Sequence, residues 1–237
     1  MSNEDTQDIL KKLQQHVHER EAQIQRRIRS ELNPFREGIR VAPSTSRNFG
    51  IFKESFLEFR NKYESKSKLF ESILDMESLP SITSKVGELY LLFLYLGRIE
   101  SVGNTVVDIL VMLLVANERD FHIECRHATP RIKHVVSIRD LEEERVPLTT
   151  KLNFLRDNGI SEVARIMDSE LRNDIAHLDF QVKDNEIYVR GKRAGETILE
   201  SLIDLLAGIG YAAGFLHGMA ERISIVAKRE IEEKGSA

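Results

Sequence analysis

Two long apolar stretches, residues 89–116 and 198–220, most constrain how this chain can fold. Each is long enough for a membrane span, but both contain charged residues. These are Arg98, Glu100, Asp108, Glu200 and Asp204. Because a charge is costly inside a bilayer, such positions favour buried helices of a soluble protein over membrane spans. We therefore expect a helical core and no membrane contact.

Much of the remaining chain repeats apolar residues at the three- to four-residue period of one helix face. Residues 5–32 are expected to form a long amphipathic helix with a basic C-terminal part. Its apolar stripe consists of Ile9, Leu13, Val17, Ile24, Ile28 and Leu32. Asn33 and Pro34 break this pattern, and residues 42–46 have the composition of a linker. The first helix is thus expected to end before a linker.

Helices are expected over residues 48–63 and 66–76, and then over residues 84–116 as one helix or a broken pair. Gly97 and Gly103 disfavour a regular helix in the last segment, which indicates a kink or a close helix crossing. A line of polar residues on this helix either supports functional side chains from a neighbouring helix or faces water. The line comprises Arg98, Ser101, Thr105 and Asp108.

Residues 117–147 are irregular and highly charged, and we expect them to form an insert with a basic surface loop. The candidate metal ligands in it are His122, Cys125, His127 and His134. Structural zinc sites use paired ligands at short spacings that this set does not match, so no metal site is predicted. Cys125 is the one cysteine, which excludes an internal disulfide and fits a reducing cytosol. The polar N-terminus predicts no signal peptide, and the expected location is cytoplasmic.

The C-terminal third combines short helices, a hairpin and one long helix. A helix over residues 148–157 is expected to end at Asn158–Gly159, and Ser161 is a good N-cap for the next helix. Two alternating runs around Asp184–Asn185 predict a β-hairpin. The last helix, over residues 196–232, carries small residues at every fourth position, which favours tight packing within the chain over the seam of a dimer. They are Gly210, Gly214 and Gly218.

The elements together predict an all-α protein: an up-and-down helical bundle with a small β-hairpin and an N-terminal helical extension. We expect residues 1–46 to form the amphipathic helix and linker. Residues 47–237 are expected to form the bundle domain, with residues 117–147 as a charged insert.

The candidate catalytic side chains of this chain lie close together in sequence, at Arg172, Asn173 and His177. On a helix that turns about 100° per residue, the inward stripe consists of Met167, Leu171, Ile175 and Leu178. Asn173 and His177 then lie one turn apart on the opposite face, and Arg172 is long enough to reach the same space. The hairpin follows this helix immediately, so it is expected at the rim of the same site.

The run Arg172-Asn173-Asp174-Ile175-Ala176-His177 resembles the Arg-x4-His signature of the HEPN superfamily of helical ribonucleases. The resemblance implies a HEPN-like bundle and a metal-independent endoribonuclease without a cofactor. Such an enzyme cleaves RNA through attack of the 2′-hydroxyl and leaves a cyclic phosphate. It implies catalytic roles for Arg172 and His177 and a helping role for Asn173. It also implies a homodimer with a composite site, and a toxin or antiviral defence factor with an antitoxin or regulatory partner.

The residue chemistry agrees with this resemblance. Histidine transfers protons near neutral pH, and arginine offers a permanently charged donor fork to phosphate oxygens. One histidine cannot be both base and acid at once, so two copies of the outward face in one cleft would supply both. One departure is Asp179, because HEPN toxins commonly have a Tyr at this position, two residues after the histidine. Regulation by modification of that Tyr is therefore not expected.

Basic residues around the hairpin are candidates for RNA binding, as is the basic part of the first helix. The hairpin set is Lys183, Arg190, Lys192 and Arg193. The net charge of −4 does not indicate a nucleic-acid binder but leaves room for a local basic cleft. Two alternatives remain open. One is a non-catalytic HEPN-like scaffold that binds RNA or a partner protein, and the other is a metal protein built on His122, Cys125, His127 and His134.

Overall fold

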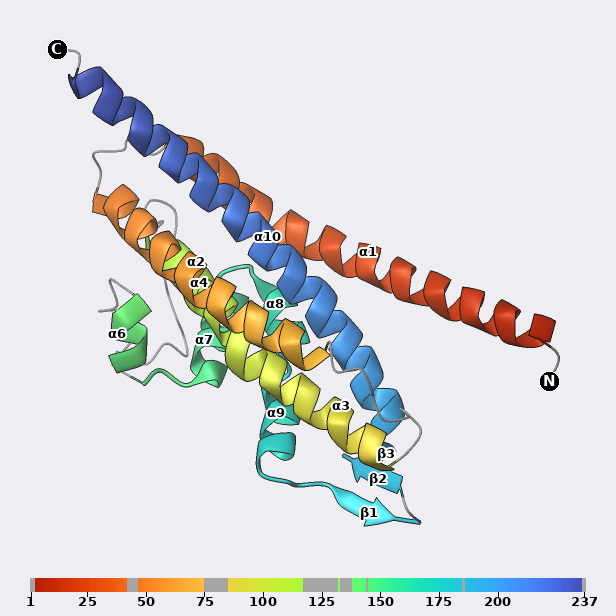
Figure 1. The fold of residues 1–237 in the computed structure, drawn as a ribbon. Helices are drawn as coiled ribbons and strands as arrows, with labels where there is room; N and C mark the ends of the chain where they lie inside the picture. Colours follow the sequence, from red (N-terminus) through yellow and green to blue (C-terminus); the bar gives the residue numbers. More distant parts are fainter. Residues whose placement is uncertain are drawn as a thin grey trace.

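A computed structural model of the chain shows an all-α helical bundle with a small antiparallel sheet, as predicted (Figure 1). The structure describes residues 3–41, 47–74, 85–116, 132, 138–143, 145–184 and 186–235. The helices are α1 (Asn3–Val41), α2 (Arg47–Leu74), α3 (Lys85–Arg98), the π-helical turn η1 (Ile99–Gly103), α4 (Asn104–Ala116), α6 (Ile138–Glu143), α7 (Leu148–Asp157), α8 (Ser161–Ile166), α9 (Ser169–Ala176) and α10 (Ala194–Gly235). The strands are β1 (Gln181–Lys183), β2 (Glu186–Val189) and β3 (Lys192–Arg193), which pair antiparallel in that order.

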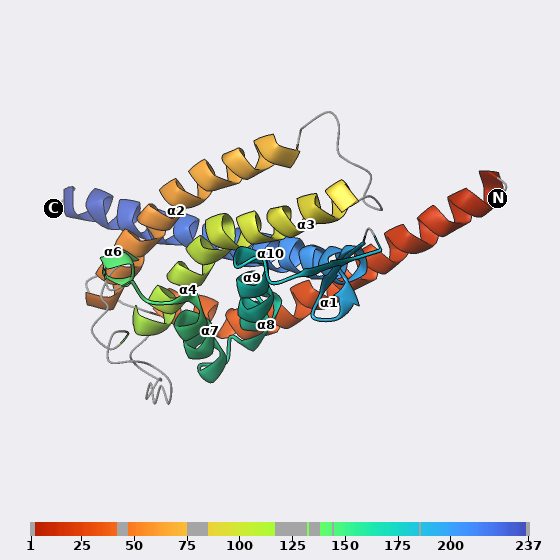
Figure 2. The same cartoon turned by 90° about the horizontal axis from the view of Figure 1, so that it is seen from below.

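The long helix α10 organises the bundle. It lies between α1 on one side and α2 and α3 on the other, as Figures 1 and 2 both show. Its residues Leu205, Ile209 and Leu216 are fully buried in the core. The N-terminal part of α1 extends beyond the other helices in both views. The predicted β-hairpin is confirmed, and a short third strand extends it towards the start of α10.

The first helix does not end at Asn33 as expected. It continues through Pro34 to Val41. A proline inside a helix costs about 3 kcal/mol, whereas burying a large apolar side chain stabilises by about 1.5–3 kcal/mol. Leu32 and Phe35, on either side of the proline, are 0% and 4% exposed, so their burial offsets the cost. α1 thus shares the core of the later helices, and the division of the chain at residue 46 stays a prediction.

The two helices expected over residues 48–76 are a single helix, α2. The ion pair between Arg60 and Glu64, with 3.0 Å between Nε and Oε1, bridges the turn at which an interruption was expected. Lys66, just beyond it, donates from Nζ to Thr105 Oγ1 of α4 at 2.9 Å. Contacts to α4 therefore hold the second half of α2 in the same helix.

Residues 85–116 form a broken pair, one of the two alternatives expected. The π-helical turn η1 separates α3 from α4 and ends at Gly103. A Cβ atom at Gly103 would lie 2.8 Å from both Cε and Sδ of Met167, which is a close crossing of the kind predicted. Gly97 takes no part in this crossing, because no neighbouring group of the described residues lies within 4 Å of a Cβ built there.

The glycine line of α10 does not pack within the described part of the chain. No atom lies within 4 Å of a Cβ built at Gly210, Gly214 or Gly218. The close approach is instead at Gly208, where a Cβ would clash with the side chain of Ile166. The favoured expectation of tight packing at this line is therefore wrong, and the dimer seam stays a prediction.

One described helical segment, Ile198–Ile225 of α10, is long and apolar enough by length and composition to cross a membrane. Its Asp204 is only 5% exposed and forms a hydrogen-bonded ion pair with Arg20 of α1. Its apolar side chains pack in the core with those of α1 and α3. These contacts are those of a core helix, in line with the sequence interpretation.

The insert predicted over residues 117–147 lies largely outside the described residues. The same holds for His122, Cys125, His127 and His134, and so for the zinc hypothesis. Within the described ranges, no group of three or more His, Cys, Asp or Glu residues could hold a metal ion.

Candidate functional site

The helix that carries Arg172 and His177 is shorter than expected. The continuous helix predicted from Ser161 onwards is broken at Met167 and Asp168 into α8 and α9. The carboxylate of Asp168 accepts hydrogen bonds from the backbone N–H groups of Glu170 and Leu171, at 3.1 and 2.9 Å. Such an N-cap typically stabilises a helix by about 0.5–2 kcal/mol. Asp168 therefore starts α9 as a separate helix with its own direction.

The predicted cap of α8 is supplied from another helix. The N-cap residue is Ile160, whose side chain makes no capping hydrogen bond, and Ser161 is the first residue of the helix. The Ser161 hydroxyl donates to Glu31 of α1 at 2.6 Å. The backbone N–H of Glu162 also donates to the Glu31 carboxylate, at 3.0 Å. A carboxylate at the positive end of the helix dipole stabilises the helix start. α1 thus caps α8, which a local reading of the sequence could not show.

The buried and exposed faces of α9 agree with the prediction along the helix but differ from it at the C-terminal end. Leu171 and Ile175 are 2% and 1% exposed, whereas Asn173 and His177 are exposed to solvent. The prediction that Leu178 faces inward is wrong, since its side chain is 60% exposed. The helix ends at Ala176 and Leu178 has a φ of +56°, so helical spacing no longer applies there.

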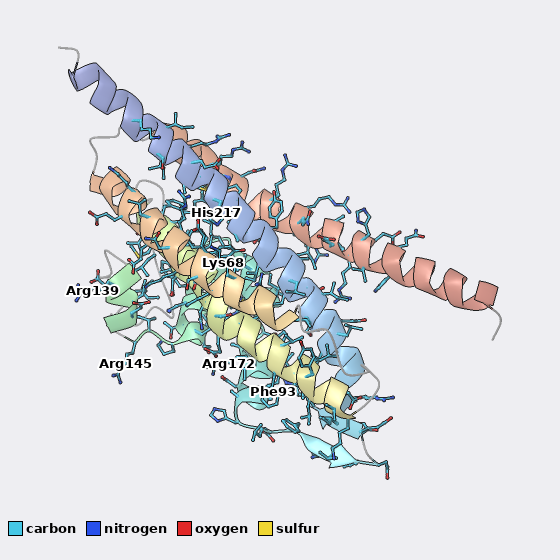
Figure 3. The ribbon with its side chains drawn as sticks, viewed as in Figure 1. Lys68, Phe93, Arg139, Arg145, Arg172 and His217 are labelled. Atoms are coloured by element: carbon cyan, nitrogen blue, oxygen red, sulfur yellow. The ribbon has the colours of Figure 1, made fainter. Side chains whose placement is uncertain are left out.

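Arg172 is held by a carboxylate from the π-helical turn. Its guanidinium pairs with Glu100 through Nε and Nη2, and Nη1 donates to Asn173 Oδ1 at 2.8 Å. The side chain of Arg172 is 30% exposed, so the guanidinium borders solvent while Glu100 fixes its orientation. Figure 3 shows Arg172 on the side of the bundle that carries α9, with Phe93 of α3 on the same side. The site is thus a surface constellation rather than an enclosed pocket.

His177 is the C-cap residue of α9. Its backbone N–H donates to Asn173 O at 2.9 Å, which keeps the histidine one turn after Asn173. Within the part of the chain that the structure describes, the imidazole has no hydrogen-bond or ion-pair partner. The ring is therefore accessible and available to a ligand or to another chain.

Two of the four residues in the polar line of α3 and α4, Thr105 and Asp108, have a different role from either of those expected. Thr105 and Asp108 are 4% and 8% exposed, so they do not face water. They are bound by lysines of other helices: Lys66 Nζ donates to Thr105 Oγ1 at 2.9 Å, and Lys151 Nζ to Asp108 Oδ1 at 2.5 Å. Burial raises the pKa of Asp108 more than the charge of Lys151 lowers it. These two residues join α4 to α2 and α7 and do not contact Arg172 or His177.

The basic residues of the hairpin fall into two groups. Arg190 forms ion pairs with three carboxylates, at 2.5 Å to Asp174, 3.4 Å to Asp168 and 3.8 Å to Glu170. Partial burial alone would lower the pKa of Arg190, but the hydrogen bond to Asp174 and the three negative charges outweigh it, so the pKa lies above its usual value. Arg190 therefore ties the sheet to α9, and RNA could engage it only by displacing these carboxylates.

Arg193 is held in the same manner, at 3.0 Å from Glu88 of α3 and 3.0 Å from Glu186 of β2. By contrast, Lys183 and Lys192 are exposed and form no ion pair with any described residue. RNA binding by these two lysines stays a prediction.

Sequence reasoning missed two residues that shape the site. The N-cap signal of Asp168 was visible, because an Asp immediately before a helical run is a common helix start. The role of Glu100 carried no such signal. Glu100 lies in the π-helical turn between α3 and α4, and π-helical turns are frequent at functional sites.

Comparison with known proteins gives no match to a family model, to a curated protein or to a solved structure. The case for the site therefore depends on its own residues and their geometry.

Proposed function

We propose that the protein is a cytoplasmic, metal-independent endoribonuclease of HEPN type that works as a homodimer. The observation that carries the proposal is the arrangement of α9. The helix buries Leu171 and Ile175 and presents Arg172, Asn173 and His177 on its outer side. The resemblance of this run to the HEPN signature supplies the reaction.

The proposed chemistry needs a proton-transfer group and a fixed positive charge. His177 takes the proton of the ribose 2′-hydroxyl or protonates the leaving 5′-oxygen, and Arg172 stabilises the charge that develops on the phosphate. A guanidinium has five N–H groups, so Arg172 retains donors for a phosphate oxygen while Glu100 and Asn173 orient it. Glu100 and Asn173 would therefore position the charge before RNA binds.

A second copy of the chain would supply the second histidine. Two apolar side chains near the motif are well exposed: Leu178, next to His177, at 60%, and Phe93, on the helix that leads to Glu100, at 52%. Exposed apolar side chains of this size often mark surfaces that a partner covers. They support a dimer in which the outer faces of two α9 helices share one cleft.

The decisive experiment is cleavage of single-stranded RNA in the presence of EDTA. The wild type is expected to cut, and Arg172→Ala and His177→Ala are each expected to lower the rate by at least about a hundredfold, the size of effect usual for acid–base and charge-stabilising groups. Matched controls are Arg156→Ala on α7 and His18→Ala on α1, both exposed and outside the motif. Equal cleavage by the wild type and both motif variants, or loss of cleavage on adding EDTA, would overturn the proposal.

The biological role follows from the resemblance alone. As a toxin or antiviral defence factor, the wild-type chain is expected to slow the growth of cells that express it, and His177→Ala is not. Co-expression of an antitoxin or regulatory partner should restore growth. Equal growth with both chains at equal protein levels would remove this role without bearing on cleavage in vitro.

The second candidate is a non-catalytic HEPN-like scaffold that binds RNA or a partner protein. The ion pairs of Arg172 with Glu100 and of Arg190 with Asp174 favour it, because they neutralise cations that a nuclease would direct at phosphate. A scaffold leaves RNA uncut, and its binding survives His177→Ala. Cleavage product that disappears with the same variant would exclude it.

A further inference from the structure

A second polar site lies away from Arg172 and His177, in a pocket of about 370 Å³ among α1, α3, α8, β3 and α10. The residues of the motif do not line it. The charged groups of its walls are Arg20, Arg165, Asp168, Lys192, Glu200 and Asp204, and Tyr95 of α3 and Ser201 of α10 also line it. The pocket therefore joins charged side chains from elements far apart in the sequence.

The carboxylates of the pocket already have partners. Arg20 of α1 donates from Nη2 to Asp204 Oδ2 at 3.1 Å and lies 3.3 Å from Glu200 through Nη1. Asp168 lies 3.4 Å from Arg190 and also caps α9. Each of the three carboxylates thus contacts an arginine, although Asp204 and Glu200 share Arg20. The basic lining residues Arg20, Arg165 and Lys192 equal the carboxylates in number, so the pocket has no surplus negative charge that would call for a cation.

The groups without partners are donors. The ammonium of Lys192 is exposed and forms no ion pair with the described residues. Tyr95 is 0% exposed, and its hydroxyl has no hydrogen-bond partner within the described structure. Burial raises the pKa of this hydroxyl well above its usual range, and the charges of Asp168 and Asp204 raise it further, so it remains a donor at neutral pH. A buried hydroxyl without a partner is unfavourable and calls for an acceptor.

Arg165 adds a third donor. Its side chain is 49% exposed, and it is 3.4 Å from Asp204, the long end of an ion-pair distance. Glu162 binds Nε and Nη2 of this guanidinium at 3.1 and 2.8 Å and fixes its plane. Nη1, whose contact to Asp204 is long, is therefore the group that can donate to a ligand. Lys192, Tyr95 and Arg165 belong to β3, α3 and α8, so their donors approach the pocket from different elements.

We propose that this pocket binds a phosphate group, carried by inorganic phosphate or by a phosphate ester. A tetrahedral phosphate presents acceptor oxygens in several directions and matches donors that come from three elements, whereas a planar carboxylate presents two oxygens in one plane. A volume of about 370 Å³ is at the small end of the usual range for small-molecule sites, about 300–1,000 Å³, which leaves room for the ester as well. The inference is independent of RNA cleavage.

The test is a titration of the full chain with inorganic phosphate and, separately, with ribose 5-phosphate. Binding is measured by calorimetry and by the change in melting temperature, both at constant ionic strength. At least one probe is expected to bind the wild type and raise its melting temperature. Lys192→Gln and Tyr95→Phe are each expected to raise the dissociation constant by about tenfold or more, since each removes a donor to a charged group. Tyr95→Phe removes only an unpaired hydroxyl, so the unliganded variant should melt no lower than the wild type.

Lys183→Gln is the matched control, because Lys183 is an exposed lysine of the same sheet that does not line the pocket. It should leave the dissociation constant unchanged. Binding of ribose 5-phosphate alone assigns the ester, and binding of inorganic phosphate assigns the free ion. The proposal is overturned if neither probe binds, if acetate binds as tightly as phosphate, or if Lys192→Gln and Tyr95→Phe bind like the wild type.

Discussion

The buried ion pair between Asp108 of α4 and Lys151 of α7 offers a sharp test of how this bundle is stabilised. Their charged atoms are 2.5 Å apart, and each residue is 8% exposed. At an effective dielectric constant of about 20, charges this close attract by about 7 kcal/mol, but removing both charges from water offsets most of that. The pair should therefore contribute little net stability while making the loss of one partner costly.

Single and double replacements separate these two effects. Asp108→Leu leaves the Lys151 ammonium buried without its partner, and we expect a loss of about 3–5 kcal/mol in the free energy of unfolding. Lys151→Met should cost less, because Lys66 also lowers the pKa of Asp108 by its charge and would continue to act on the carboxylate. The double variant, with two apolar side chains in place of the pair, should return to within about 1 kcal/mol of the wild type or exceed it.

Urea unfolding of the four proteins at neutral pH measures these differences. The coupling energy from the cycle should be at least about 2 kcal/mol, as expected for two residues in direct contact. If Asp108→Leu were as stable as the wild type, the pair would not be buried as described. If the losses of the single variants simply added in the double variant, the two side chains would not interact, and the reasoning would be refuted.

Three further outcomes test other parts of the structure. Gly103→Ala should lower the free energy of unfolding by about 1–3 kcal/mol, since its Cβ would overlap Met167. Gly97→Ala should be neutral or stabilising by up to about 1 kcal/mol, because alanine has the higher helix propensity. Urea unfolding of both variants separates the effect of the helix crossing from that of helix propensity. Asp168→Ala should cost about 0.5–2 kcal/mol by removing the cap of α9, and a matching loss of helix protection in hydrogen exchange at residues 169–176 checks that the effect is local. Burial raises the folded-state pKa of Asp108 above its unfolded value of about 3.9, so its contribution to stability is fully present below that value and is lost as pH rises through the folded-state pKa. The free energy of unfolding of the wild type, relative to that of Asp108→Asn, should therefore increase as pH falls. A constant difference between the two proteins across a pH series would contradict this.

Local patterns predicted much of the helical structure correctly. The helix over residues 148–157 was expected with the bounds of α7, because it ends at a glycine with a φ of +84°, a conformation that other residues rarely adopt. The hairpin around Asp184 was equally visible, with a positive φ at the turn. In both places the signal lies within a few residues of the structure that it specifies.

Errors arose where distant parts of the chain override local preference. Pro34 lies inside a helix because the core buries Leu32 and Phe35 beside it. Leu178 points outward because α9 ends at Ala176, two residues before the last position of its apolar period. Periodicity predicts whether a side chain is buried or exposed only within the helix. The residue at which the helix ends depends on capping and packing.

The all-α class, the hairpin, and an outward face on which Asn173 and His177 lie one turn apart could all be predicted from the amino-acid sequence. Helical period and turn chemistry are local properties, so they can be read from neighbouring residues. Tertiary structure alone decided that Glu100 holds Arg172, that Asp108 binds Lys151, and that the donors of Lys192 and Tyr95 share one pocket. These relations join residues tens of positions apart, and they arise only when packing of the core brings their helices together.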